Sequence, residues 1–343
     1  MKKLLNTLYI NKPERFLSLD GENVVVLEDG KEVGRFPLHN IGDIVTFGYT
    51  GASPALMGEC VRRNIPIVFM SSHGRFLARV TGEVRGNVTL RKEQFRRSDN
   101  DEQSALIARN MLTGKIYNAK WVLERAMRDH PMRVDTSDLS KKSAFLSQAM
   151  ESIRKSTSLE VLRGLEGEAA SIYFSGFDQL ILQQKDDFKF STRSKRPPLD
   201  RVNAMLSFAY TLLAGMCAAA LEAVGLDPYV GFLHRDRPGR ASLALDLMEE
   251  LRATIADRFV LTVINTRILN ANDFLVKENG AVFLQDEARK TFLTQWQSKK
   301  QDIITHPFLN EKLEWGMVPY VQAMLLARYL RGDLDEYPPF LWK

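Results

Sequence analysis

The sequence predicts an α+β protein with a small N-terminal β-sheet domain followed by a larger all-α C-terminal domain. The chain has 343 residues, which is more than one hydrophobic core usually organises. Over about the first ninety residues, apolar side chains occur in short runs separated by turn residues, which is typical of strands. From about residue 100 they recur at helical spacing. We therefore expect a β-rich domain over residues 1–92 and a helical domain over residues 93–343.

A hairpin is the clearest element of the β-rich segment. Val24–Leu27 and Glu32–Phe36 are strand-like runs, and Asp29-Gly30 between them suits the tip of the turn. A short helix is expected to begin at Ser53-Pro54, a capping serine followed by a proline at the first helical position. The remaining strand candidates are Asp43–Phe47, Ile65–Met70 and Phe76–Thr81, the last two joined by residues 71–75.

Helical patterns follow one another from residue 105 to near the C-terminus. After a first pattern over 105–126, we expect helices at 141–156, 158–184, 200–225, 241–259, 263–271, 286–301 and 317–331. Residues 204–221 contain no charged residue over 18 positions, which is close to the lower limit for a membrane span. Ser207, Tyr210 and Thr211 interrupt this stretch, and the aromatic and basic flanks of a span are missing. We therefore expect a buried helix and no membrane association.

Composition and cysteine usage limit the class of protein. Apolar residues make up 45% of the chain and charged residues 26%, as in soluble globular proteins. The formal net charge of +5 permits a nucleic-acid partner without requiring one. Cys60 and Cys217 are far apart and outside any CxxC pair, so we expect neither a thiolate metal site nor a disulfide framework. Residues 1–16 contain no sustained apolar run, which argues against a signal peptide and favours a cytoplasmic location.

Two basic segments interrupt the helical and strand patterns. Residues 85–100 hold five basic side chains against Glu93 and Asp99, which fits a solvated linker or a DNA contact. Residues 185–201 combine six basic side chains, Arg193 and Arg196 among them, with Phe188 and Phe190. A basic loop with aromatic residues suits a phosphate backbone and a stacked base, but a flexible connection has the same composition. The residues alone leave both interpretations open.

One polar loop and the helix after it contain the first candidate site. Walker, GxGxxG, GxSxG and HExxH motifs are absent from the sequence. His234 lies in an arginine-rich loop with Arg235, Arg237 and Arg240, and the helix expected next places Asp246, Glu249 and Glu250 at positions i, i+3 and i+4. Oxygen ligands with one imidazole suit Mg²⁺ or Mn²⁺ better than a closed zinc site. A solvated acidic helix face is the alternative.

A second candidate lies in the stretch from Gly164 to Gly167. The two glycines beside Leu165-Glu166 reduce helix stability by up to about 1 kcal/mol each relative to alanine. A close approach of backbone or ligand would explain them, and Glu166 would then point into an occupied space. The alternative is close helix packing with Glu166 exposed. Glu168, two residues further on, is the competing carboxylate and lies on another helix face.

These segments, in this order, resemble the CRISPR-associated adaptation integrases, the family numbered first among the CRISPR-associated proteins. The resemblance covers the whole chain, and Tyr337–Lys343 resembles the ending of the type I-C branch. One departure is Ala253, where many relatives have proline, and we expect it to alter a helix end. The segments that resemble the family are Leu162–Gly167 with 169–170 and 173–174, Arg196–Pro198 with Asp200, Asn203, 206–208 and Tyr210, Gly225–Pro228, Gly231–His234, and Ser242–Ala244 with Asp246–Glu249 and Arg252.

The resemblance implies a site, a reaction and partners. The catalytic metal ligands fall on Glu166, His234 and Glu249, with Asp246 as an auxiliary acid and Mg²⁺ or Mn²⁺ as the cofactor. The reaction implied is transesterification, in which the 3′-hydroxyl of a DNA fragment attacks a phosphodiester of the CRISPR repeat, with nuclease activity at the same centre. The partners implied are double-stranded DNA, a second copy of the chain, with residues 1–92 as the expected dimerisation domain, and a small ferredoxin-like CRISPR-associated protein.

Two further functions were compatible with the residues. A general metal-dependent repair nuclease on branched DNA would keep the three ligands without a CRISPR partner, and a catalytically silent DNA-binding scaffold would not need the ligands to converge. For DNA contact we expect Arg235, Arg237 and Arg240 near the site and Arg193 and Arg196 further out.

Overall fold

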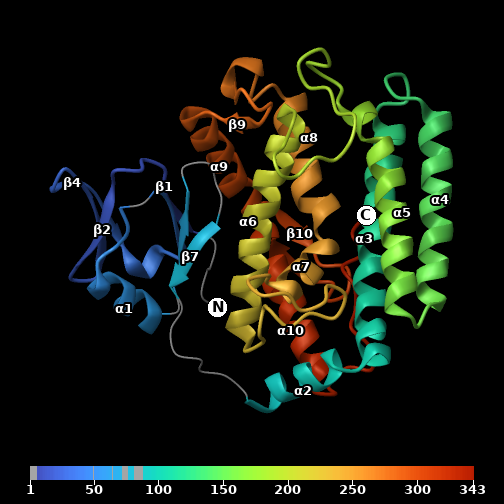
Figure 1. Ribbon diagram of the computed structural model, residues 1–343, viewed down its shortest axis with the longest axis horizontal. Coiled ribbons are helices and arrows are strands. Elements are labelled where there is room, and N and C mark those ends of the chain that lie inside the picture. Colours follow the sequence, from blue (N-terminus) through green and yellow to red (C-terminus); the bar gives the residue numbers. More distant parts are fainter. Residues whose placement is uncertain (1–5, 49, 64, 72–75, 81–87) are drawn as a thin grey trace. The chain divides into compact units, whose positions relative to one another are not determined.

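The computed structural model describes residues 6–48, 50–63, 65–71, 76–80 and 88–343 (Figure 1). The chain divides into two compact units. Unit 1 comprises Met1–Arg85, Leu284–Asp302 and Glu314–Met317, and unit 2 comprises Gly86–Phe283, Ile303–Leu313 and Val318–Lys343. Residues 284–302 and 314–317 therefore group with the N-terminal segment. The sequence had placed them in the helical domain. The role of residues 1–92 in dimerisation stays a prediction.

Unit 1 contains two β-sheets. The first has the order β1-β5-β6-β7, in which β1, β5 and β6 are parallel and β7 is antiparallel to β6. The second is the antiparallel sheet β2-β3-β4. The bounds of the strands are β1 Thr7–Ile10, β2 Phe16–Asp20, β3 Asn23–Glu28, β4 Lys31–Pro37, β5 Asp43–Phe47, β6 Ile67–Met70 and β7 Phe76–Val80.

The predicted hairpin is confirmed as β3 and β4. Asp29 and Gly30 at its tip have positive φ angles of 51° and 75°, the geometry that matches the twist of a two-residue hairpin. The predicted short helix is α1, Pro54–Arg62, whose cap Ser53 accepts a hydrogen bond from the Leu56 amide at 3.2 Å. Residues 72–75 and Thr81 lie outside the described residues.

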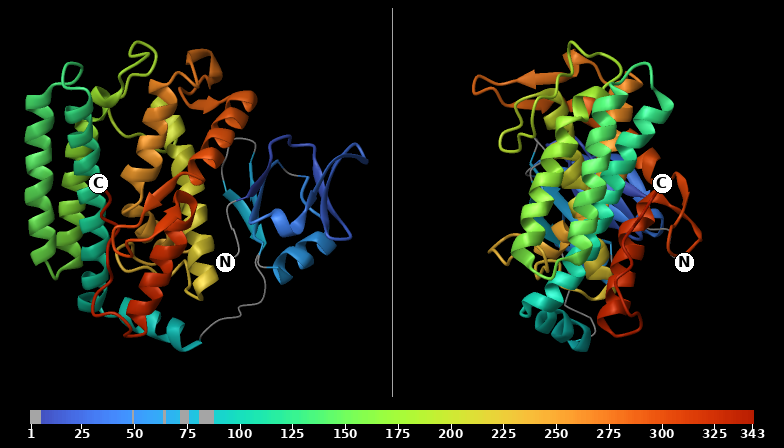
Figure 2. Two further views of the ribbon diagram at one scale, coloured as in Figure 1. Left: turned by 180° about the vertical axis from the view of Figure 1, so that it is seen from behind. Right: turned by 90° about the vertical axis from the view of Figure 1, so that its right-hand side faces the viewer.

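Unit 2 is mostly helical, and α3, α4 and α5 lie side by side in both views (Figures 1 and 2). Its helices are α2 Val88–Ser98, α3 Asp101–Asp129, α4 Thr136–Lys155, α5 Leu159–Ser175, α6 Arg201–Val224, α7 Ser242–Glu249, a π-helix at Arg252–Asp257, α8 Arg258–Asn265 and α10 Val318–Leu330. Helix α9, Asp286–Lys300, belongs to unit 1. Short 3-10 turns lie at Leu38–Asn40, Phe177–Leu180, Ala271–Asp273 and Trp315–Met317, and short strands are β8 Phe274–Val276, β9 Val282–Leu284, β10 Ile303–Thr305 and β11 Lys312–Glu314.

Several sequence-based expectations about helices differ from the structure. The helix expected over 158–184 ends at Ser175. The basic segment 85–100 is helical over Val88–Ser98, so the linker interpretation is wrong for these residues. The single helix expected over 241–259 is instead α7, the π-helix and the start of α8. The helix expected over 263–271 is also wrong, because α8 ends at Asn265.

Helix α6 is the central apolar helix of unit 2. Among the described residues it is the one helix long and apolar enough to cross a membrane by length and composition, and 67% of its most apolar window is buried inside the protein. The prediction of a buried helix is confirmed. Asp200 caps it, as predicted, by accepting a hydrogen bond from the Asn203 amide at 2.7 Å.

Candidate active site

The loop that contains His234 is organised by a single carboxylate. Asp246 on α7 is fully buried and accepts hydrogen bonds from the backbone N–H groups of Phe232, Leu233 and His234 at 2.6, 2.9 and 3.0 Å. A Cβ atom on Gly231 would lie 2.8 Å from the Asp246 carboxylate, so the close approach of loop and helix requires glycine here. Asp246 thus fixes the loop against α7.

The same carboxylate orients the imidazole. Nδ1 of His234 lies 2.6 Å from Oδ1 of Asp246. Because the ionised carboxylate accepts, Nδ1 of the histidine is the donor, and Nε2 is the ring nitrogen that can coordinate a metal. A carboxylate–histidine pair of this kind commonly supports a metal ligand. Asp246, the predicted auxiliary acid, therefore positions the imidazole of His234.

Glu249 holds a buried negative charge at the end of α7. Its Oε1 lies 2.9 Å from Arg252, three residues later, and its Oε2 lies 2.7 Å from Nζ of Lys115 on α3. Burial alone would raise the pKa of Glu249, but Arg252 and Lys115 outweigh it and lower this pKa to about 2. Glu249 therefore stays ionised at neutral pH.

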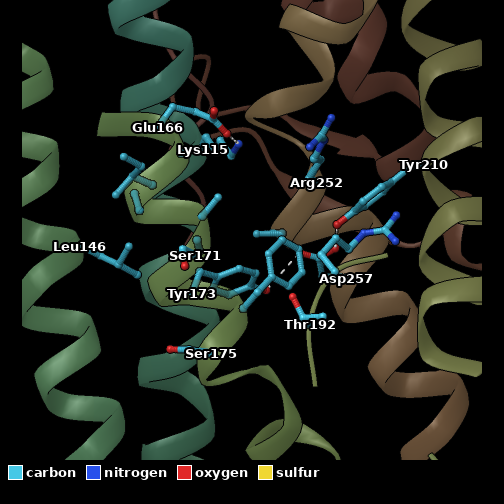
Figure 3. A pocket seen from close by; sticks show the side chains of 18 of the residues that line it. Lys115, Leu146, Glu166, Ser171, Tyr173, Ser175, Thr192, Tyr210, Arg252 and Asp257 are labelled. Atoms are coloured by element: carbon cyan, nitrogen blue, oxygen red, sulfur yellow. Dashed lines mark hydrogen bonds and ion pairs between the residues drawn. The ribbon is translucent and has the colours of Figure 1, made fainter. Parts of the chain in front are cut away.

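Glu166 on α5 meets the same lysine. Its carboxylate forms an ion pair with Lys115 (Figure 3), so two of the three predicted ligands share one ammonium group. Glu168 is exposed, in line with its assignment to another helix face. A Cβ on Gly164 or Gly167 would meet no described atom within 4 Å, so close helix packing does not explain these glycines.

The helix of Glu166 is tied to the loop of His234. Arg163, one turn before Glu166, donates two hydrogen bonds to the carbonyl of Leu233 at 3.0 and 2.8 Å. His234 is close enough to Glu249 to help lower its pKa. In the described part of the chain, however, no three His, Cys, Asp or Glu side chains are gathered closely enough to hold a metal ion. Convergence of Glu166, His234 and Glu249 on one ion stays a prediction.

The donor set nevertheless fits a divalent cation. The Lys115 ammonium supplies the positive charge between the carboxylates of Glu166 and Glu249, as a metal ion would. Although Oε2 of Glu249 is close to that ammonium, it is buried and, within the described residues, accepts no hydrogen bond of ordinary geometry. Two carboxylates with an available imidazole nitrogen are ligands that Mg²⁺ and Mn²⁺ accept. Glu166, Glu249 and His234 are therefore the residues that would hold such an ion.

A pocket opens beside Glu166, which lies on its wall (Figure 3). Its volume is about 430 Å³, and Lys115, Arg193, Lys195 and Arg252 place four cationic side chains on its wall. The aromatic part of the wall consists of Tyr173, Phe174 and Tyr210. Cationic and aromatic groups together suit a phosphate and a base.

A buried carboxylate lies under the tyrosines of this pocket. Asp257 accepts hydrogen bonds from the hydroxyls of Tyr210 and Tyr173 at 2.5 and 3.1 Å, and burial raises its pKa to about 6. The guanidinium groups of Arg193 and Arg252 lie 5.2 and 5.0 Å from the centre of the Tyr210 ring. Arg252 and Asp257 are the two ends of the π-helix, whose i→i+5 geometry brings residues five apart towards the same side. Both ends therefore line the pocket.

The predicted DNA-contacting arginines occupy different environments. Arg235, Arg237 and Arg196 are exposed, and half-buried Arg240 donates to the carbonyl of Arg235. Arg193 is not an outer contact, because it lines the pocket and binds the Asn203 side chain at 2.6 Å.

Stacking of Phe188 and Phe190 on a base was one of the two interpretations left open for the 185–201 segment. This interpretation is wrong. Phe188 packs edge-on against Phe274, and Phe190 packs against Phe174 and Phe177. Both Phe188 and Phe190 are buried, because the loop folds back onto unit 2 and uses its aromatic rings as core.

Comparison with known proteins identifies the family. The family model described as CRISPR associated protein Cas1 matches residues 8–298. A CRISPR-associated endonuclease Cas1 of Chlorobaculum tepidum is 48% identical over 343 residues and covers 100% of both chains. A second such endonuclease, of Rhodospirillum rubrum, is 51% identical over 347 residues, again with 100% of both chains covered. The chain belongs to the Cas1 family.

Solved structures share the fold of this Cas1-family chain. A CAS1 protein from Thermotoga maritima superposes with a TM-score of 0.80 at 22% identity and covers 95% of this chain and 97% of its own. A casposase bound to its integration product superposes with a TM-score of 0.84 at 22% identity, with 98% and 93% of the two chains covered. The prediction of an α+β fold with N-terminal sheets and a mostly helical C-terminal part is confirmed.

Sequence reasoning missed Lys115 and Asp257, and it named Arg252 only within the family resemblance, without a role at the site. Lys115 occurs within a long regular helix, where one lysine among apolar positions has no distinguishing pattern. Asp257 and Arg252 were available as signals, because each is a charged residue in a run of otherwise apolar helix. Asp257 is buried and bonds to the Tyr210 hydroxyl, and half-buried Arg252 pairs with Glu249. These contacts link both residues to the Cas1 site.

Proposed function

We propose that this Cas1-family endonuclease is a metal-dependent DNA integrase of CRISPR adaptation. The observation that supports this most is the pairing of Glu166 and Glu249 with one cation, Lys115. Lys115 and Glu166 lie on the wall of a pocket that is lined by further cationic side chains. Carboxylates with a cation suit Mg²⁺ or Mn²⁺ binding, and a cationic pocket beside them suits a DNA phosphate. The carboxylates that would hold a metal ion and the cationic groups that would hold a DNA phosphate are therefore adjacent.

The proposed reaction is a transesterification. The 3′-hydroxyl oxygen of a DNA fragment forms a new bond to phosphorus, and the bond from that phosphorus to the 3′-oxygen of the repeat strand breaks. The attacking hydroxyl loses its proton to solvent, and the leaving 3′-oxygen takes up a proton from solvent to become a hydroxyl. One phosphodiester replaces another, so no nucleotide triphosphate is consumed. Water in place of the 3′-hydroxyl gives hydrolysis. A bound divalent ion would polarise the phosphoryl oxygen and stabilise the leaving oxygen.

The residues of the chain have separate tasks in this proposal. Arg252 and Lys115 keep Glu249 ionised, so that it is available as a ligand at neutral pH. Asp246 holds the imidazole of His234 with Nε2 available. Lys195 and Arg193 provide positive charge along the pocket, where the phosphates of an incoming strand would otherwise repel the two glutamates.

Partners follow from the family and from one related assembly. A solved structure described as a Cas6-RT-Cas1–Cas2 complex contains a part that superposes on 100% of this chain with a TM-score of 0.82. We extend this to the present chain as an expectation of double-stranded DNA, a second copy of itself and a small ferredoxin-like Cas2 protein. Membership of the type I-C branch is also part of the proposal.

A strand-joining assay with a chemical control tests the reaction. A labelled duplex with free 3′-hydroxyl ends should become joined to a plasmid carrying a repeat when Mn²⁺ and the Cas2 partner are present. The same duplex with 3′-deoxy ends should not be joined, because it lacks the attacking oxygen. If both duplexes were joined equally, or neither was, the transesterification would be refuted. Cleavage without joining would favour a repair nuclease.

A further inference from the structure

The segment Tyr337–Trp342 near the C-terminus lies against the residue that follows Glu249. Glu250 is fully buried. Its Oε1 accepts hydrogen bonds from the Tyr337 hydroxyl and from Nε2 of Gln322, the latter at 3.1 Å. Its Oε2 accepts the backbone N–H of Phe340 at 2.8 Å. At the end of α7, Glu249 therefore pairs with Lys115 and Arg252, whereas Glu250 binds the C-terminal segment.

The same segment is bound to the helix that contains Lys115. Asn118, one turn after Lys115 on α3, donates to the backbone carbonyls of Glu250 and Phe340 at 2.7 Å each. Its Oδ1 accepts the backbone N–H of Trp342 at 3.0 Å. A single buried amide thus joins α3, the end of α7 and the C-terminal segment, which runs beside α3 (Figures 1 and 2).

Packing leaves little room for these parts to move separately. Gly114, directly before Lys115, faces Glu250, and a Cβ atom at Gly114 would lie 3.0 Å from Cβ of Glu250 and 3.3 Å from Cβ of Pro339. The contact is close enough that a displaced C-terminal segment would release the turn at Glu250. Regular helix also stops here, since α7 ends at Glu249 and the π-helix begins at Arg252. The backbone carbonyl of Glu250 is held by the side chain of Asn118, which comes from outside this helix.

We infer that Glu250, Asn118 and the C-terminal segment Tyr337–Trp342 form a clamp that positions Glu249 for metal binding. Three buried hydrogen bonds to the Glu250 carboxylate and one to its carbonyl fix the peptide next to Glu249. A ligand whose backbone is fixed before the ion arrives binds that ion more tightly. The clamp residues are positioning residues, and the inference rests on the proposed metal-dependent function.

The test compares two tyrosine-to-phenylalanine substitutions in the full chain. Tyr337→Phe removes the hydroxyl that donates to Glu250 and leaves the ring in place. Tyr320→Phe, on α10 and outside the partners of Glu250, is the matched control. The dissociation constant for Mn²⁺ is measured by isothermal titration calorimetry on metal-free protein, together with the unfolding temperature. We expect Tyr337→Phe to weaken Mn²⁺ binding about 10-fold, the scale typical of contacts that support a metal ligand. The control should stay within about twofold of the unsubstituted chain.

The outcomes separate the clamp from a general structural role and from the proposed function. A lower unfolding temperature for Tyr337→Phe with unchanged Mn²⁺ affinity would overturn the clamp. Failure of the unsubstituted chain to bind Mn²⁺ would instead refute the proposed metal dependence.

A second measurement needs no substitution. Coupling between two sites is reciprocal, so Mn²⁺ should slow backbone hydrogen exchange in Tyr337–Trp342 of the unsubstituted chain. Exchange in this segment that is unchanged at saturating Mn²⁺ would also overturn the clamp, even if Tyr337→Phe did not fold.

Discussion

Nδ1 of His234 and Oδ1 of Asp246 lie 2.6 Å apart, and the same carboxylate holds the backbone of the loop that contains the histidine. The imidazole therefore cannot rotate without breaking a hydrogen bond to a fully buried acid. Asp246 acts at the site through His234 and through the loop backbone.

Asp246→Asn should weaken Mn²⁺ binding. The amide is isosteric with the carboxylate but has one acceptor atom in place of two, so it cannot accept from the loop amides and also hold Nδ1 of His234. We expect a loss of about 10- to 100-fold in metal affinity, measured by calorimetry, with strand joining partly restored at high Mn²⁺. Mn²⁺ affinity equal to that of the unsubstituted chain would contradict the positioning role.

Arg252→Met should destabilise the fold at neutral pH. The substitution removes the guanidinium 2.9 Å from the buried Glu249 carboxylate and keeps an unbranched apolar stem. Breaking a buried pair by removing one partner costs about 3 kcal/mol or more in unfolding free energy. Urea denaturation at pH 7 measures this loss, and a change below about 1 kcal/mol would show that Lys115 alone compensates Glu249.

The same pair predicts the acid sensitivity of the unsubstituted chain. The pKa of Glu249 is lowered from 4.5 to about 2 in the folded state. A lowered carboxyl pKa contributes stability that is present above pH 4.5 and is lost as the pH falls through about 2. The Arg252→Met chain should lose less stability over this range, and an identical pH profile for the two chains would contradict the assignment.

Asp257 predicts the opposite dependence on pH. Burial raises its pKa from 3.8 to about 6, so its contribution to folding is full below pH 3.8 and is lost as the pH rises through 6. Asp257→Asn does not titrate. Relative to the unsubstituted chain, its unfolding free energy should therefore rise by up to about 3 kcal/mol between pH 4 and pH 7. Denaturation at several pH values measures this difference, which should stay constant if Asp257 keeps an ordinary pKa.

The arginines of the His234 loop should contribute to DNA affinity. Arg235 and Arg237 are exposed beside the site, so phosphates attracted to them would lie near the proposed metal ligands. Changing Arg235, Arg237 and Arg240 together to alanine should weaken duplex binding and flatten its salt dependence. A salt titration of binding tests this. Unchanged affinity and slope would place the DNA path elsewhere.

Local sequence patterns predicted several elements whose structure depends on residues close to them in the sequence. The hairpin at Asp29-Gly30, strand β5 and the caps at Ser53 and Asp200 all follow from turn, alternation and capping preferences. Strand β2 was missed, although it pairs with the neighbouring strand β3. Strand β1 was also missed, because it is held by parallel pairing with a strand more than thirty residues away, as Thr7 opposite Asp43 shows. Long-range pairing of this kind leaves little trace in a short sequence window.

The site was predictable in its ligands more than in its surroundings. Glu166 and Glu249 were singled out by unusual flanking residues and by the family resemblance, and the structure brings both to Lys115. The lysine itself was not found, because its partners come from two other helices. The interpretation of Phe190 stayed open for the same reason, since only the folded loop shows that its ring faces the core.

Replacement of His234 by alanine tests the central proposal most directly. The measurement is strand joining of a 3′-hydroxyl duplex at saturating Mn²⁺, with duplex affinity measured in parallel and His130→Ala, an exposed histidine at the end of α3, as the control. We predict that His234→Ala loses joining and cleavage while duplex affinity stays within about twofold, because affinity comes mainly from basic groups. A His234→Ala chain that joins strands at the rate of the His130→Ala control would contradict the proposed site.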